Sequence, residues 1–213
     1  MNNVTALAAS TLSDVNTLAL SINAGQFSNG AGLTTVAISD ATIDATALAT
    51  AIDNLDVINL GSTTDMTLAS GATINVDAGE VTEMLLDETQ NRLDIVDQNI
   101  TVTNAISAAE AKLLADTTTG VVTATIATTA RVSDLKLLPA ESNAFTIVIS
   151  SEDATSSTAA EFNAINSATS VAVDMTNVTA LAASTLSDVN TLALAIKDWR
   201  NTDQIRNGGR LTT

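Results

Sequence analysis

The chain has 213 residues and a net charge of −16, with no cysteine and no histidine, so imidazole or thiolate catalysis and the usual zinc sites are excluded. The acidity disfavours nucleic acid and anionic membranes as partners, because contacts with phosphate need clustered lysine and arginine. Hydrophobic residues make up 46% of the chain and aromatic residues only 2%, which favours thin stacked layers over a thick globular core.

Short runs that alternate apolar and small polar residues recur along the chain. Alternation of this kind is typical of half-buried β-strands. It predicts nine strands, at residues 17–22, 34–39, 56–60, 72–76, 99–103, 121–126, 145–150, 171–175 and 191–196. Their average spacing of about 22 residues is typical of repeats that combine one strand with one helix.

Segments rich in alanine and leucine separate these strands and have apolar residues at helical spacing. They predict helices at residues 45–55, 80–96, 107–115, 129–138, 157–168 and 177–186. Asp44, Ser107 and Ser157 are the expected N-cap residues of three of them. Ser107 is followed three residues later by Glu110, the spacing of a capping box. The stretch 61–71 interrupts the pattern and predicts an additional short strand or loop.

The alternation of strand and helix, without hairpin signals, predicts parallel strands joined by right-handed crossovers. We therefore expect an α/β solenoid of about eight strand–turn–helix coils over residues 1–196. Its plan resembles a leucine-rich-repeat horseshoe, although the LxxLxL frame of that family is absent. An all-β solenoid, with the alanine-rich segments as coil, is the alternative prediction.

Both ends of this repeat region have nearly the same sequence. Residues 1–22 read MNNVTALAASTLSDVNTLALSI and residues 175–196 read MTNVTALAASTLSDVNTLALAI, which is 20 identities in 22 positions. This identity indicates a recent duplication within a longer repetitive gene. A surface used between adjacent coils would then be available again between molecules. Contacts of this heterologous kind build filaments, so the sequence predicts head-to-tail self-association.

Residues 197–213 differ from the rest, and we expect them to form a basic C-terminal cap or tail. They contain four of the eight basic residues and the only tryptophan, Trp199. Trp199 is expected to cover the open end of the last coil, with a disordered tail or linker as the alternative. Together with Arg200 and Arg206, it forms the predicted capping and self-association site, where the basic end meets the acidic body of a neighbouring molecule.

Four polar residues near predicted strand ends are candidate calcium ligands, because calcium prefers carboxylate and amide oxygens. They are Asp40, Asp77, Asn104 and Asp174. Both the nonapeptide of calcium-binding β-rolls and the EF-hand loop are absent, so the alternative is that these residues satisfy helix N-termini and turns. Apart from this calcium candidate we expect no cofactor, no catalytic residue and no enzymatic activity.

Two longer stretches read ITVTNAISAAEAKLLADTTTGVVTATI and FTIVISSEDATSSTAAEFNAINSATSVAVDM. In style they resemble repeats of very large bacterial cell-surface proteins, especially cyanobacterial and proteobacterial ones, over residues 4–196. The resemblance implies an extracellular structural role in an adhesin, sheath or surface layer. A binding module for calcium, a glycan or a protein is the alternative. No apolar run approaches the roughly 18 residues of a membrane span.

Overall fold

A computed structural model describes residues 4–27, 33–58, 65–140, 143–202 and 205–206, with side chains described up to residue 196. Among these residues there are seven α-helices and eleven short strands. The chain forms two compact units. The first contains residues 1–101 and 117–120, and the second contains residues 102–116 and 121–213.

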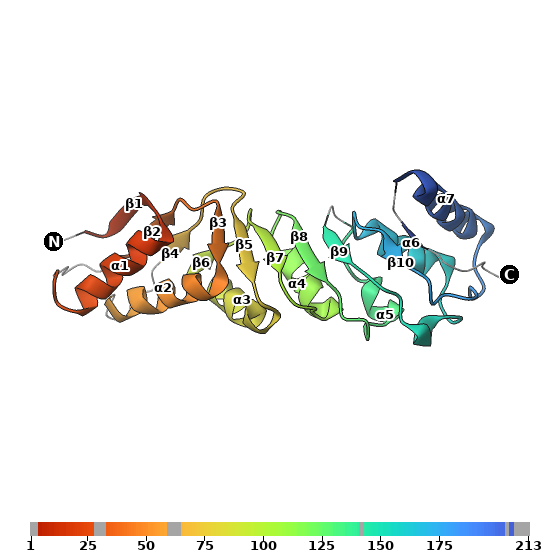
Figure 1. The fold of residues 1–213 in the computed structure, drawn as a ribbon, viewed down its shortest axis with the longest axis horizontal. Coiled ribbons are helices and arrows are strands. Elements are labelled where there is room, and N and C mark those ends of the chain that lie inside the picture. The colour runs from red at the N-terminus through yellow and green to blue at the C-terminus, as the bar shows by residue number, and fades with distance from the viewer. Residues whose placement is uncertain (1–3, 28–32, 59–64, 141–142, 203–204, 207–213) are drawn as a thin grey trace. The chain divides into compact units, whose positions relative to one another are not determined.

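Strands and helices alternate along the chain (Figure 1). In order they are β1 (Ala6–Ser10), α1 (Leu12–Asn23), β2 (Thr35–Ile38), β3 (Thr42–Asp44), α2 (Ala45–Ile58), β4 (Asp65–Thr67), β5 (Thr73–Val76), the 3-10 helix η1 (Ala78–Glu80), α3 (Val81–Thr89), β6 (Leu93–Asp94), β7 (Asn99–Val102), α4 (Ala108–Thr117), β8 (Val122–Thr125), α5 (Val132–Leu135), β9 (Ala144–Thr146), the 3-10 helix η2 (Ser151–Asp153), α6 (Ala159–Ser167), β10 (Val173–Asp174), α7 (Leu186–Thr202) and β11 (Ile205–Arg206).

The first unit contains two ladders of strands. One has the order β1-β2-β4-β6, and in the other β3, β5 and β7 are neighbours. Ala6 pairs in parallel with Thr35, Thr35 with Asp65, and Thr42 with Thr73, so the sequence separation of paired residues is nearly constant. Before α2, and again before α3, the chain adds one strand to each ladder. The helices return the chain between parallel strands, as parallel pairing requires.

In the second unit, Thr123 of β8 pairs in parallel with Ala144 of β9, a shorter separation than in the first unit. Val173 of β10 pairs in parallel with Ile205 of β11. An isolated parallel bridge joins Val148 to Asp174. Parallel pairing between strands separated by a helix is therefore common to both units.

Mostly aliphatic residues form the core of each unit. In the first, the alternating strand residues Ile74 and Val76 are buried together with Leu48 of α2. In the second, the two buried phenylalanines, Phe145 and Phe162, come from β9 and α6. The period-2 pattern on strands and the 3.6 pattern on helices thus place their apolar faces inward.

Side chains close in sequence cap the N-termini of several helices. Asp44 accepts a backbone N–H at the start of α2, and Ser107 forms the predicted capping box with Glu110 at the start of α4. The third cap is Thr158, one residue after the predicted Ser157, and its own box partner is a glutamate three residues later. The sequence therefore predicts the N-cap residues of these three helices to within one residue.

The mixed α/β class with parallel strands is confirmed, and the all-β alternative is wrong. Predicted strands overlap β2, β5, β7, β8, β9 and β10. The interruption at 61–71 contains the additional strand β4. Three predictions made from alternation are wrong. Residues 17–22 lie in α1, residues 191–196 in α7, and residues 56–58 in α2, while residues 59 and 60 lie outside the described chain.

The predicted helix at 177–186 is also wrong, because the helix begins only at Leu186. A run such as TLALSI fits a strand and a helix equally well, and the threonine cap that precedes it in the sequence decides for the helix. A uniform spacing of about 22 residues is wrong for the first unit, where roughly 30 residues separate paired positions. The missed strands β3 and β6 have only three and two residues, too few for alternation to be visible. β1 has five residues, but its sequence ALAAS shows no clear alternation of apolar and polar residues.

Candidate functional site

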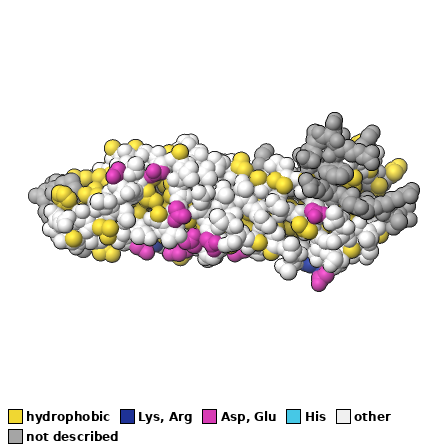
Figure 2. All heavy atoms as spheres, in the orientation of Figure 1, with side chains coloured by type: hydrophobic (Ala, Val, Ile, Leu, Met, Phe, Trp, Pro, Cys, Tyr) yellow, Lys and Arg dark blue, Asp and Glu magenta, His cyan; other side chains and the backbone are white. Residues whose placement is uncertain are grey.

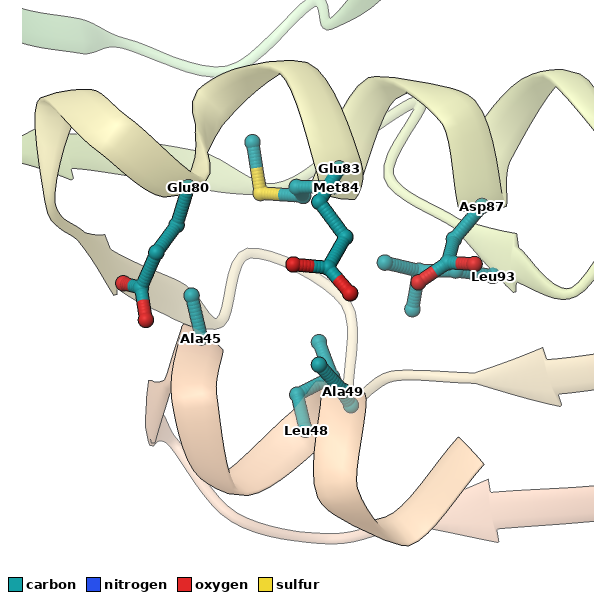
Figure 3. Close-up of a pocket in the computed structure, with 8 residues that line it drawn as sticks. All are labelled: Ala45, Leu48, Ala49, Glu80, Glu83, Met84, Asp87 and Leu93. Carbon is teal, nitrogen blue, oxygen red and sulfur yellow. The ribbon is translucent and has the colours of Figure 1, made fainter. Parts of the chain in front are cut away.

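A small groove lies between α2 and the segment η1–α3 in the first unit (Figure 3). Its lining residues are Ala45, Leu48, Ala49, Glu80, Glu83, Met84, Asp87 and Leu93. Leu48, Met84 and Leu93 are buried and make it apolar. The carboxylates lie along one side of the η1–α3 segment and point toward α2, as their spacing on a helix predicts (Figure 3).

An arginine closes one end of this acidic row. Arg92 Nη1 lies 2.8 Å from Asp87 Oδ1, and Arg92 Nη2 contacts Asp56 and lies 3.4 Å from Asp53 Oδ1. Only 17% of the Arg92 side chain is exposed, and only 7% of Asp87. One guanidinium therefore connects α2 with the end of α3, in a partly desolvated setting where removal of one partner would leave an uncompensated charge.

The backbone positions this arginine. Asn91, the residue before it, has a positive φ of 56°, a conformation that asparagine tolerates better than most residues. Just beyond the end of α3, the Arg92 N–H donates to the Asp87 carbonyl at 2.9 Å. The reversal at Asn91 thus brings Arg92 back over the helix end, in the manner of a left-handed C-terminal cap.

The acidic groups around Arg92 outnumber it. Burial raises the pKa of Asp87 above its usual range, the Arg92 guanidinium opposes this, and repulsion from Glu83, Asp53 and Asp56 adds to the rise. Acidic side chains gather over α2 and α3 on the face seen in Figure 2. Within the described residues, however, no group of three or more acidic side chains is arranged to hold a metal ion. The arrangement is that of a structural ion-pair network.

A second set of ion pairs lies in the second unit. Arg131 contacts Glu152, and its Nη2 lies 3.2 Å from Asp153 Oδ1. Asp153 is buried and also accepts the backbone N–H of Val132 at 3.0 Å, so it anchors the start of α5. These contacts connect segments 21 and 22 residues apart in sequence.

Glu161 forms another long-range ion pair among the described residues of this unit. Lys136 Nζ lies 2.7 Å from Glu161 Oε1, while the other carboxylate oxygen accepts the Thr158 backbone N–H at 2.9 Å. The hydrogen bond from Lys136, aided by that from Thr158, lowers the pKa of Glu161 below its ordinary value. The carboxylate therefore caps α6 and pairs with a cation at the same time.

The four calcium candidates have individual positions in the fold. Asp40 accepts the Leu12 N–H at 2.6 Å at the start of α1, Asp77 accepts the Gly79 N–H at 2.9 Å, and Asp174 accepts a backbone N–H two residues later at 2.9 Å. These three satisfy helix starts and turns, which was the alternative prediction. The fourth, Asn104, is exposed just after the end of β7.

The predicted capping site in the tail falls outside the described side chains. Trp199 and Arg200 belong to the helical backbone of α7, and Arg206 belongs to β11. No helix in the described parts of the chain has both the length and the apolar character needed to cross a membrane.

The two nearly identical segments begin their helices in the same way. Thr11 caps α1 and Thr185 caps α7, and each hydroxyl accepts the N–H of the aspartate three residues later, at 3.2 and 3.1 Å. Each threonine hydroxyl also donates to that aspartate's carboxylate, at 2.8 and 2.6 Å. Local sequence alone therefore fixes where both helices begin.

The same segments differ in tertiary environment. Leu12 is 8% exposed, whereas its counterpart Leu186 is 85% exposed. Val15 is buried and Val189 is only half-buried. Leu192, by contrast, is buried on another face of α7. The copies bury different faces of one helix sequence, and the face that α1 buries is largely exposed on α7, with Val189 half-buried.

No family model matches the chain, and the searches of curated proteins and of solved structures find no match. The sequence did not single out the Arg92 network as a site. A signal was present, because only four basic residues occur before residue 197 and each was a candidate for a fixed structural role.

Proposed function

We propose that the chain is a structural repeat protein of the cell exterior. In this proposal its strand–helix units form a solenoid that acts as a spacer or self-assembling element of a surface layer, sheath, filament or adhesin. The proposal includes no enzymatic activity.

One observation carries the proposal. Each of the pairs β1–β2, β2–β4 and β3–β5 is parallel, with a nearly constant sequence separation between partners, and a helix lies between the paired strands. Regular addition of one strand per ladder and one helix is the way in which solenoids extend. A core that is mostly aliphatic, with two buried phenylalanines, supports layers that stack closely.

The near-identity of residues 1–22 and 175–196 supports assembly. A large acidic excess keeps an abundant surface protein soluble, which also agrees with an exterior role.

Surface location is tested with antibodies against the purified chain. They are expected to label intact, unpermeabilised cells that produce it, and surface proteolysis is expected to remove the label. Labelling only after permeabilisation would overturn the exterior role. Small-angle scattering tests the solenoid: an elongated particle of constant cross-section is expected, and a globular particle would refute it.

A further inference from the structure

The first copy of the duplicated segment is docked in a defined way. Its strand β1 pairs with β2, with Leu7 opposite Val36. Its helix α1 lies beside α2, where Asn54 Nδ2 donates to Asn16 Oδ1 at 2.7 Å (Figure 1). Together with the buried face of α1, these contacts make a docking site on β2 and α2 for one particular sequence.

All residues of the docked segment 4–22 except Ser21 are repeated in the second copy. Leu186, Val189 and Asn190 correspond to Leu12, Val15 and Asn16. The copies differ only at positions 2 and 21 against 176 and 195, which supply none of the contacts just described. The second copy therefore carries a complete set of docking side chains.

Part of this set is available on the second copy, although Val178 and Leu192 are buried within their own chain. Leu186 is largely exposed, and Asn190 is exposed. The segment 181–185, which corresponds to most of β1 and the cap, forms no strand. The Ala182 N–H donates to the Ser157 carbonyl and Ser184 Oγ accepts the Ala159 N–H, so docking elsewhere would exchange these two contacts. The helix of the second copy is already formed and capped at Thr185, so docking would need little additional ordering of that helix.

We propose that residues 178–196 of one molecule dock on β2 and α2 of a second molecule, in the place that residues 4–22 occupy within a single chain. The occupant is a second copy of this protein, joined head to tail by exchange of equivalent segments. This inference deepens the proposed function and rests on it, because it names the contact through which the chain would assemble.

Competition from the resident copy sets the conditions for exchange. Residues 4–22 are tethered to their own docking site, with an effective concentration on the order of millimolar. At micromolar protein, a segment of equal affinity from another molecule is at a disadvantage of about a thousandfold. Exchange therefore occurs at high local density, as on a crowded surface, or when the resident copy is weakened. Each exchange leaves the second copy of the receiving molecule free to dock on a further molecule, so the head-to-tail chain of molecules can grow without closing.

The first experiment measures binding of a labelled synthetic peptide of residues 175–196 to the full-length chain by fluorescence anisotropy. The chain carries Leu12→Asp and Val15→Asp, which weaken only the resident copy. Saturable binding is expected, at least tenfold tighter than to the wild-type chain. The matched control peptide carries Leu186→Asp and Val189→Asp and is expected to bind at least tenfold more weakly. Equal binding of both peptides would overturn the proposal.

The second experiment leaves the apolar docking residues of both copies unchanged and does not depend on the Leu12→Asp and Val15→Asp chain. The chain has no cysteine, so single cysteines give unambiguous cross-links. Chains with Asn54→Cys are mixed with chains with Asn190→Cys near millimolar concentration and treated with a short bis-maleimide. Dimers are expected in the mixture well above those of either chain alone. The positive control is one chain with Asn16→Cys and Asn54→Cys, which is expected to cross-link internally.

The outcome that refutes segment exchange is a mixture that gives no more dimer than the separate chains while the positive control reacts. That result, combined with surface labelling of intact cells, would leave the proposed function standing and remove only this contact. Efficient cross-linking without surface labelling would do the reverse, so the two proposals fail separately.

Discussion

The duplicated helix offers an internal comparison of burial that few proteins provide. Leu12 and Leu186 each occupy the first position after a threonine cap, within segments of nearly identical sequence. Helix propensity and capping therefore cancel between Leu12→Ala and Leu186→Ala. What differs is tertiary burial, with exposed fractions of 8% and 85%.

The expected magnitudes follow from that difference. Truncating a buried leucine to alanine costs about 2–5 kcal/mol, and a position at a helix end belongs to the lower part of this range. We expect Leu12→Ala to lower the free energy of unfolding of the first unit by about 2–3 kcal/mol. Leu186→Ala is expected to change that of the second unit by about 0.5 kcal/mol or less, as for an exposed side chain.

Two units need not unfold together, so an assay resolved along the sequence is required. Hydrogen exchange followed by mass spectrometry, on peptides covering α1 and α7, reports each helix separately. The measurements are made at low micromolar protein, below the range in which exchange between molecules is expected. Equal losses of protection for the two variants would refute the reasoning. A large loss at α7 alone would do so more directly, because it would mean that Leu186 is covered.

Three further substitutions test other contacts, each by chemical denaturation. Arg92→Met leaves Asp87 buried beside other carboxylates without its partner, so we expect the free energy of unfolding to fall by about 2–4 kcal/mol at pH 7. This loss should shrink at lower pH, because Asp87, whose pKa is raised, becomes protonated. A loss independent of pH would contradict this. Glu161→Gln is expected to lower the free energy of unfolding by about 1 kcal/mol at neutral pH. The pKa of Glu161 is lowered in the folded state, so its ionised carboxylate stabilises the fold at any pH above 4.5, the ordinary pKa of a glutamate. That cost should vanish in acid as the wild-type group protonates, and a cost that persists there would count against the assignment. Gly120→Ala would press a methyl group into the backbone carbonyl of Gln98, for an expected loss of about 1–3 kcal/mol, whereas the control Gly79→Ala, with 3.4 Å to its nearest neighbour, should be nearly neutral.

Features that depend on neighbours in sequence could be predicted well. The run ATINV at 72–76 and the run NITVT at 99–103 alternate cleanly, and both contain strands. The Ser107–Glu110 capping box predicted the start of α4. In each case the interactions that decide the structure lie within a few residues.

Features that depend on distant segments could not be predicted. Residues 6–10 and 180–184 have the same sequence, ALAAS, yet the first forms β1 and the second forms no strand of that length. A strand needs a paired neighbour, and the first copy has β2 beside it. The Arg92 network likewise joins residues up to 39 positions apart, which no local pattern encodes. The same limit applies to the groove between α2 and α3.

The pairing of the basic residues has a consequence for how molecules of this protein approach one another. Arg92, Lys112, Arg131 and Lys136 are the only positive side chains in residues 1–196, and each is in contact with a carboxylate. This region therefore presents an almost unbroken negative field to its surroundings. In dilute buffer that field keeps molecules apart, whereas at about 0.15 M salt it is screened beyond roughly 8 Å. For a protein that assembles outside the cell, as proposed, the ionic strength of the medium would thus act as the control on assembly, holding chains apart in fresh water and letting short-range apolar contacts take effect in saline water.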